Sequence, residues 1–318
     1  MKFDLDEQQR DFAASIDAAL GAGDVPGAVR AWATGDSGPG RKVWSTLTDL
    51  GVTALIVPER FDGIDAHPVD LVVAAERLGY WGVPGPVTES IAVAPLLLAD
   101  DERCGGLASG ELIATVALPP HVPRAVDADS AGLILVAADG EVRDGTVGDF
   151  HPSVDPARKL FDVSASGDSR KADTARAFEF GVLATAAQLV GAGQSMLDKS
   201  VDYAKQRSQF GRTIGSYQAI KHKLADVHIA VEMARPLVFG AALSLADRSA
   251  DAARDVSAAL VAATESALLS ARSSLQTHGA IGYTQEHDLG LLLLRVQALR
   301  SAWGDPTWHR RRLLEALS

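Results

Sequence analysis

The stretch YAKQRSQFGRTIGSYQAIKHKLADV, residues 203–227, joins the two most strongly periodic parts of the chain. On each side of it, mostly apolar residues recur at spacings of three and four, which places each set on one face of a helix. The first set is Leu183, Ala187, Val190, Gln194, Leu197 and Val201, and the second is Ile220, Leu224, Val227, Val231, Ala234 and Val238. Two long amphipathic helices therefore meet at a turn that contains Gly211 and Gly215.

Two further helical runs follow, over residues 251–278 and from about 285 to 302. Short connections between consecutive helices favour antiparallel neighbours. The C-terminal part, residues 169–318, is therefore predicted to be a four-helix bundle.

Upstream of the bundle, the expected secondary structure changes at two points. Residues 1–104 read as a helical domain, with helices expected at 5–20, 43–50, 68–78 and 86–98 and with Pro and Gly breaks at 57–68 and 82–86. Residues 105–168 read as a small β domain, with strands expected at 112–118, 132–137, 141–142 and 160–163. Asp139-Gly140 is a hairpin signal, and the polar residues 167–176 fit a linker. The predicted fold is mostly α, with a shortened β domain between two helical parts.

Composition excludes several classes of function. The formal charge of −11 disfavours sequence-independent binding to nucleic acid or to an anionic membrane, because both need a cationic face. The single cysteine, Cys104, cannot form an intramolecular disulfide. The N-terminus MKFDLDEQQRDF is acidic where a secretory peptide is basic, and no segment suggests a membrane span, so a cytoplasmic protein is expected. Metal-binding, nicotinamide-binding and nucleophile-elbow motifs are missing, and no metal site is expected.

Two segments look unlike plain bundle sequence. Around the turn in residues 203–227, a guanidinium, amides and an aromatic ring could meet a planar or anionic ligand, although a solvated helix cap is an equal alternative. The residues concerned are Arg207, Gln209, Phe210 and Gln218. In QTHGAIGYTQEHD, residues 276–288, the small residues Gly279 and Ala280 would admit a phosphate beside Gln276, or the segment is an ordinary turn with a glycine cap. His278 and His287 are interpreted as structural.

The C-terminal segment AWGDPTWHRRRLLEAL, residues 302–317, is also distinctive. Trp303 and Trp308 are expected to pack against the bundle. Its three arginines, residues 310–312, could bind phosphate, but a role at an exposed helix end is favoured.

These segments together resemble the acyl-CoA dehydrogenase family. YAKQRSQFGRTIGSYQAIKHKLAD is similar to that family's signature Tyr-Ala-x-x-Arg-x-Gln-Phe-Gly-x-x-Ile, followed by Gln-x-Ile and Leu-Ala-Asp. QTHGAIGYTQEHD resembles the second signature, in the branch that reads Gln-x-His-Gly-Gly-x-Gly-Phe-Thr-x-Glu-His. LGVTALIVPERFDGID at 50–65 and ERLG at 76–79 are also similar, so the resemblance covers nearly the whole chain.

The resemblance implies an FAD enzyme that removes a proton from Cα and a hydride from Cβ of an acyl-CoA, with an electron-transfer flavoprotein as acceptor. By position, it implies that the ADP half of FAD, bound to a neighbouring subunit, is contacted by Arg207, Gln209, Phe210, Gln218, Gln276, Gly279 and Ala280, the last in place of the usual Gly.

Three departures from the family pattern change what the resemblance implies. The usual Glu base before a Gly-Thr is replaced by Trp303-Gly304-Asp305, and the alternative base position falls at or near Gly181. Glu179 is two residues away, about 200° around a helix, and is not assigned as base. The β domain is short and lacks the stretch that cradles the flavin ring. No catalytic residue is therefore assigned.

The pattern resembles the shorter subunit of the α2β2 acyl-CoA dehydrogenases of actinobacterial steroid catabolism. This implies that a full-length paralogue supplies the base and that the complex oxidises an acyl-CoA. Two alternatives stay open. One is a self-sufficient homomeric dehydrogenase that uses Glu179 or Asp305, and the other is an assembly subunit that binds no flavin.

Overall fold

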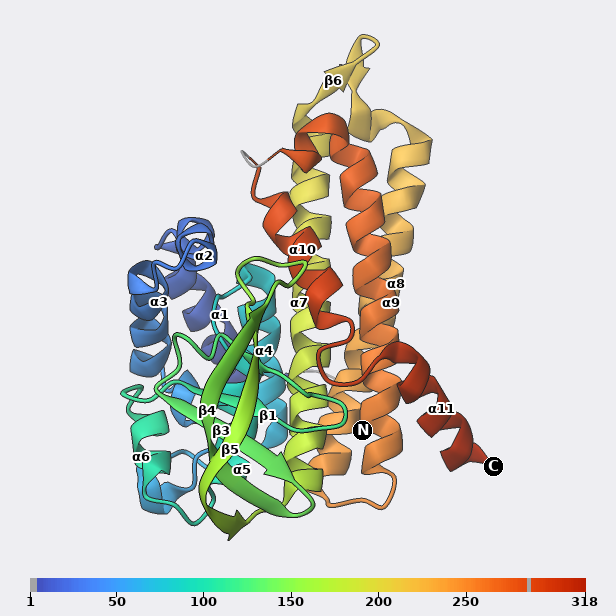
Figure 1. Cartoon of the computed structure of the whole chain (residues 1–318). Helices are drawn as coiled ribbons and strands as arrows, with labels where there is room; N and C mark the ends of the chain where they lie inside the picture. Colours follow the sequence, from blue (N-terminus) through green and yellow to red (C-terminus); the bar gives the residue numbers. More distant parts are fainter. Residues whose placement is uncertain (1–4, 285–286) are drawn as a thin grey trace.

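The computed structural model describes residues 5–284 and 287–318. It has three parts: short N-terminal helices, a small sheet, and long C-terminal helices that run side by side (Figure 1). The prediction of a mostly α fold with a small β part between two helical parts is confirmed. The boundaries proposed at residues 104 and 168 stay a prediction.

The N-terminal part contains more helices than its sequence indicated. The elements are α1 (Glu7–Gly21), α2 (Val25–Ala33), α3 (Gly38–Asp49), η1 (Val52–Ala54), η2 (Glu59–Phe61), α4 (Pro68–Trp81), η3 (Thr88–Val93), α5 (Ala94–Leu97) and α6 (Arg103–Ala108). α2 and α6 were not predicted. Pro26 and Gly27 look like a break, but proline is tolerated in a first helical turn, and Asp24 caps α2 by accepting from the Gly27 N–H.

The sheet has five strands, β1 (Ala114–Ala117), β2 (Ala125–Val126), β3 (Leu133–Ala138), β4 (Glu141–His151) and β5 (Leu160–Lys171), in the order β1-β3-β4-β5-β2. The predicted hairpin is confirmed, because Asp139 and Gly140 connect β3 to β4 with φ of +50° and +78°. The prediction that residues 167–176 form a linker is wrong. Those residues end β5 and begin α7, and they are polar because the outer part of the β4–β5 pair faces solvent.

The bundle consists of α7 (Thr174–Gln206), α8 (Gln218–Ala246), α9 (Ala252–His278) and α10 (Leu289–Leu299), as predicted. The expected start of the fourth helix at Gln285 lies outside the described residues. α11 (Pro306–Leu317) follows, and its end points away from the body (Figure 1). α4 joins the N-terminal part to the bundle, because its backbone touches that of α7. A Cβ on Gly191 would lie 1.9 Å from the Glu76 carbonyl oxygen, so only glycine allows this approach.

Two helices, α7 and α8, are long and apolar enough to cross a membrane by length and composition, which the sequence analysis did not anticipate. Of the most apolar window of α7, 94% is buried inside the protein, as expected for a core helix. The corresponding share for α8 is 39%, so much of its apolar surface faces outward.

Candidate functional site

The turn between α7 and α8 is a small hairpin at the end of the bundle (Figure 1). It consists of β6 (Ser208–Gln209), β7 (Arg212–Thr213) and the single turn η4 (Ile214–Ser216). Phe210 and Gly211 form its tip with φ of +52° and +80°, and the Phe210 side chain is 92% exposed. Positive φ is unusual for a bulky residue, and the exposed Phe210 ring packs against little of the described chain. A ligand or a partner that covers this ring would explain the arrangement.

The contacts that hold the hairpin do not involve the side chains of the predicted ligand residues. Arg212 lies over the Tyr217 ring at 3.9 Å, and the Tyr217 hydroxyl donates to the Gln209 carbonyl oxygen at 3.1 Å. The side chains of Arg207, Gln209 and Gln218 are exposed and have no hydrogen bond or ion pair with any described residue. These side chains cap nothing in the described part of the chain, and their exposure fits both solvated polar groups and ligand-binding residues, so their role stays a prediction.

The second predicted segment lies at the same end of the bundle, where α9 ends and η5 (Gly279–Tyr283) begins. Gln276, Gly279 and Ala280 are exposed, and apart from Gly279 and its chain neighbours no described residue has an atom within 4 Å of where a Gly279 Cβ would stand. Gly279 has a φ of +67°, which favours glycine. Gln285 and Glu286, also in this segment, lie outside the described residues.

An aromatic stack connects the two segments. Tyr203, in the last turn of α7, stacks on His278 with ring centroids 4.5 Å apart, and His287 meets His278 edge-on at 4.9 Å. His278 Nδ1 donates to the Ser274 carbonyl oxygen at 2.8 Å, and burial lowers the pKa of His278, which favours the neutral form. The structural interpretation of both histidines agrees with these contacts. Among the described residues, no group of three or more His, Cys, Asp or Glu could hold a metal ion.

The positions at which the resemblance places the catalytic base form a second region, and packed side chains fill it. Trp303 is fully buried and lies on Gly181, where an added Cβ would come within 2.3 Å of the indole ring. Phe178 contacts both Trp303 and Trp308, with ring centroids 5.9 and 5.8 Å away. The prediction that both tryptophans pack against the bundle is confirmed. Position 181 cannot carry any side chain while Trp303 occupies this space.

The two nearby carboxylates are committed to structural contacts. Glu179 forms a two-point ion pair with Arg312 of α11, with Arg312 Nη1 3.1 Å from Oε2, and burial raises the pKa of Glu179. Asp305 caps α11 by accepting from the N–H groups of Thr307 at 2.8 Å and Trp308 at 3.1 Å, and these bonds lower its pKa. Glu179 is therefore held at both carboxylate oxygens, whereas Asp305 uses Oδ1 for the cap.

His309 completes this second region, and sequence reasoning missed it. Its side chain is fully buried, its Nε2 donates to the Trp303 carbonyl oxygen at 2.9 Å, and its Nδ1 accepts from the Ser257 hydroxyl at 3.0 Å. Burial is the main cause that lowers the pKa of His309 to about 4. A histidine in the run HRRR gave no signal of burial, because its neighbours on α11 are mostly exposed.

A cavity of about 170 Å³ lies beside this region, between the segment around residues 121–126 and the end of α10. Its two guanidinium groups are already neutralised, since Arg158 pairs with Glu89 at 3.2 Å and Arg124 with Asp162 at 3.0 Å. Ligand pockets in proteins are usually about 300–1,000 Å³. This space is therefore small for a flavin ring.

Comparison with known proteins agrees with this architecture. Residues 6–100 match the profile of the acyl-CoA dehydrogenase N-terminal domain, and residues 172–318 match that of the acyl-CoA dehydrogenase C-terminal domain. The chain is 33% identical to acyl-CoA dehydrogenase IpdE2 of Mycolicibacterium smegmatis over 91% of this chain and 92% of that protein. It is 32% identical to acyl-CoA dehydrogenase IpdE2 of Mycobacterium tuberculosis over 91% and 90%.

The fold is also similar to solved structures. A chain of the ChsE4-ChsE5 complex from Mycobacterium tuberculosis superimposes with a TM-score of 0.86 at 22% identity, covering 100% of this chain and 99% of that one. Two domain profiles and two relatives above 30% identity over nine-tenths of the chain agree with each other. The protein is therefore a member of the acyl-CoA dehydrogenase family of oxidoreductases.

Proposed function

We propose that this chain is one subunit of a heteromeric, FAD-dependent acyl-CoA dehydrogenase that forms a 2,3-enoyl-CoA. In this proposal it contributes contacts to the ADP half of FAD, while a full-length paralogue in an α2β2 complex supplies the catalytic base. The observation that carries the proposal is a contrast within the chain. The donors at the end of the bundle are exposed and have no partner among the residues that the structure describes, whereas the base positions are filled by Trp303 or held in structural contacts.

The residues at the end of the bundle fit the ADP half of FAD. Arg207 would bind a phosphate through its exposed guanidinium, and the amides of Gln209, Gln218 and Gln276 can donate and accept hydrogen bonds. Phe210 would offer its exposed ring to a planar group, and the open backbone at Gly279 and Ala280 would admit a phosphate. When bound, the flavin supplies the hydride acceptor.

A partner is supported by the exposed face of α8. Ile229, Met233 and Leu237 lie on that face with exposures of 59%, 69% and 45%. Apolar residues that form such a stripe on one helix commonly mark a surface that another subunit covers. The helix begins at Gln218, so this stripe and part of the proposed FAD surface lie on the same helix.

Known relatives support the partner and the substrate class. One structural neighbour is a complex, ChsE4-ChsE5, and another is described as the steroid ACAD Tcur3481-Tcur3483, with a TM-score of 0.86 at 19% identity. We propose CoA thioesters from steroid or lipid breakdown as substrates, in the cytoplasm. An electron-transfer flavoprotein is the proposed electron acceptor.

The alternatives make different predictions. A homomeric enzyme would need Glu179 or Asp305 as base, which the Arg312 pair and the α11 cap disfavour. An assembly subunit without flavin would not need three amides and a guanidinium, none paired within the described residues, at one end of the bundle. Neither alternative is favoured by a specific contact.

The test is expression of this chain alone and together with a candidate full-length paralogue, followed by measurement of flavin content and native mass. We expect a flavin-free chain alone and a yellow α2β2 complex, with about one FAD per heterodimer, that oxidises an acyl-CoA. A colourless, inactive complex would indicate an assembly subunit. Flavin binding and turnover by this chain alone would contradict the half-site proposal.

A further inference from the structure

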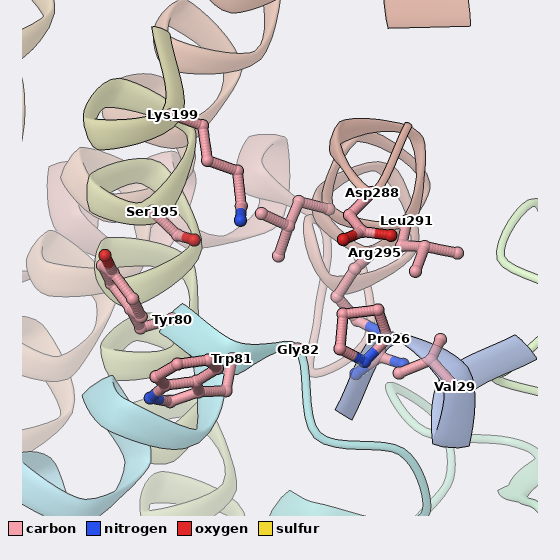
Figure 2. A pocket seen from close by; sticks show the side chains of 11 residues that line it. Pro26, Val29, Tyr80, Trp81, Gly82, Ser195, Lys199, Asp288, Leu291 and Arg295 are labelled. Atoms are coloured by element: carbon pink, nitrogen blue, oxygen red, sulfur yellow. The ribbon is translucent and has the colours of Figure 1, made fainter. Parts of the chain in front are cut away.

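A cavity of about 130 Å³ lies where the N-terminal helices meet the bundle, between α2, α4, α7 and α10. Figure 2 shows its lining side chains, which converge from these four helices on one space. The cavity is separate from the proposed FAD surface, since none of the residues implied in FAD binding lines it.

Lys199 provides the distinctive chemistry of this cavity. It belongs to α7, most of which is buried, and its side chain extends into the space, with the ammonium group toward the centre of the view in Figure 2. Lys199 has no ion pair or hydrogen bond with any described residue. Ser195, one helical turn earlier, is only 1% exposed, and its hydroxyl likewise has no partner among the described residues.

The other polar groups that line the cavity already have partners. Arg295 donates to Asp155 at 2.5 Å and to the Val83 carbonyl oxygen at 2.8 Å. Asp288 accepts from Arg30 at 2.7 Å. The Tyr80 hydroxyl donates to Asp198, which also accepts from Gln194. Lys199 is therefore the uncompensated cation of the lining, within the part of the chain that the structure describes.

The rest of the wall is apolar. It consists of Pro26, Val29, Trp81, Leu291 and Leu292. A ligand that fits this cavity therefore needs an anionic group at one end and an aliphatic part at the other. A cavity of about 150 Å³ holds benzene, which has six heavy atoms, so a ligand of similar size fits here.

We propose that this cavity binds a small aliphatic monocarboxylate, with its carboxylate on Lys199 Nζ and the Ser195 hydroxyl and its chain against Trp81 and Leu292. A charge-assisted bond to an ammonium in a partly enclosed site is stronger than a neutral one, so the negative charge decides the selectivity. The aliphatic end gains from leaving water against an apolar wall. The assignment does not depend on the flavin or on the partner subunit.

The probe for the test is butyrate, with butyramide as a neutral ligand of the same shape. Calorimetric titration of the purified full chain should give a Kd of about 1–10 mM for butyrate, as expected for six heavy atoms. Butyramide should bind at least about tenfold more weakly, because it lacks the charge. This comparison uses the unaltered chain and needs no variant to fold.

Two variants test where the ligand binds. Lys199→Met keeps the length of the side chain and removes its charge, and it should weaken butyrate binding at least about tenfold. Lys42→Met, which removes an exposed lysine of α3 outside the cavity, should leave it unchanged. Equal binding of butyrate and butyramide, equal binding to Lys199→Met, or no binding of butyrate at about 50 mM would overturn the proposal. Displacement of butyrate by equal concentrations of chloride or phosphate would overturn the aliphatic part of the assignment.

Discussion

The end of the bundle and the junction around Trp303 both carry positions that the family resemblance implies in FAD binding or catalysis, yet they differ in burial and in polar contacts. At the bundle end, Arg207, Gln209 and Phe210 are exposed, and their side chains have no polar partner in the described residues. At the junction, Trp303 and His309 are fully buried, and Glu179 is held by Arg312. One region presents exposed polar groups that have no partner in the described part of the chain, and the other is part of the packed core.

This difference separates groups that are available to a ligand from groups that stabilise the fold. An exposed guanidinium and exposed amides contribute little to the stability of their own chain, and under the proposed function they bind FAD. Buried tryptophans contribute to stability through packing. Substitutions at the bundle end should therefore change binding without changing folding, and substitutions at the junction should do the reverse.

The largest effect is expected for Trp303→Ala. The indole is fully buried, and its N–H has no hydrogen-bond partner in the described residues, so the loss comes from packing and from the cavity left behind. The free energy of unfolding should fall by about 3–5 kcal/mol, measured by urea denaturation of the full chain. Phe210→Ala, which removes an exposed ring, should change it by less than about 0.5 kcal/mol. Equal effects of the two variants would break the comparison.

Arg207→Ala should act on binding instead. Loss of a charge-assisted contact to phosphate should weaken FAD binding in the proposed complex by about 2–4 kcal/mol. Equilibrium dialysis or fluorescence titration of the complex would measure this change. Lys205→Ala removes an exposed cation two residues earlier and serves as the matched control. Unchanged FAD affinity in Arg207→Ala would contradict the assignment, provided that the variant still assembles.

The junction should also respond to pH through His309. Its folded pKa of about 4 lies below the ordinary value of 6.5, so folding favours the neutral ring. The stabilisation is therefore complete above about pH 6.5 and is lost as the pH falls toward 4, at a total of roughly 3 kcal/mol. Urea denaturation between pH 7 and pH 4 would show this fall. The His309→Gln variant should lose much of the pH dependence, whereas His228→Gln, at an exposed position of α8, should keep it.

The smallest effect is expected for Asp305→Asn. Asparagine caps helices about as well as aspartate, so the free energy of unfolding should change by less than about 1 kcal/mol. If the base lies on the partner subunit, turnover of the complex should stay within about twofold of the unaltered value. A loss of activity by orders of magnitude would assign a catalytic role to Asp305 and would favour the homomeric alternative.

Local patterns predicted much of this fold. The long helices followed from apolar spacing, and the β3–β4 hairpin from Asp139-Gly140, because both signals act within a few residues. The outer parts of β4 and β5 were missed for the opposite reason. Their polar residues face solvent and are strand only because each pairs with the other, as in the register of Gly145 with Ala165. α2 was missed because its Pro26 and Gly27 also fit a turn.

The sequence by itself determined the family and the bundle, because the signals that carry them lie in contiguous segments and in apolar spacing along helices. The contact of the seven named residues with FAD stays a prediction. Only the tertiary structure decided how the rest of the chain uses its polar groups. Gly181 and Trp303, 122 positions apart by their residue numbers, meet in the core, and Glu179 meets Arg312 from another helix. Lys199 faces a cavity formed by four helices. Such contacts depend on packing between distant elements, and helical periodicity carries no information about which partner a buried face will meet.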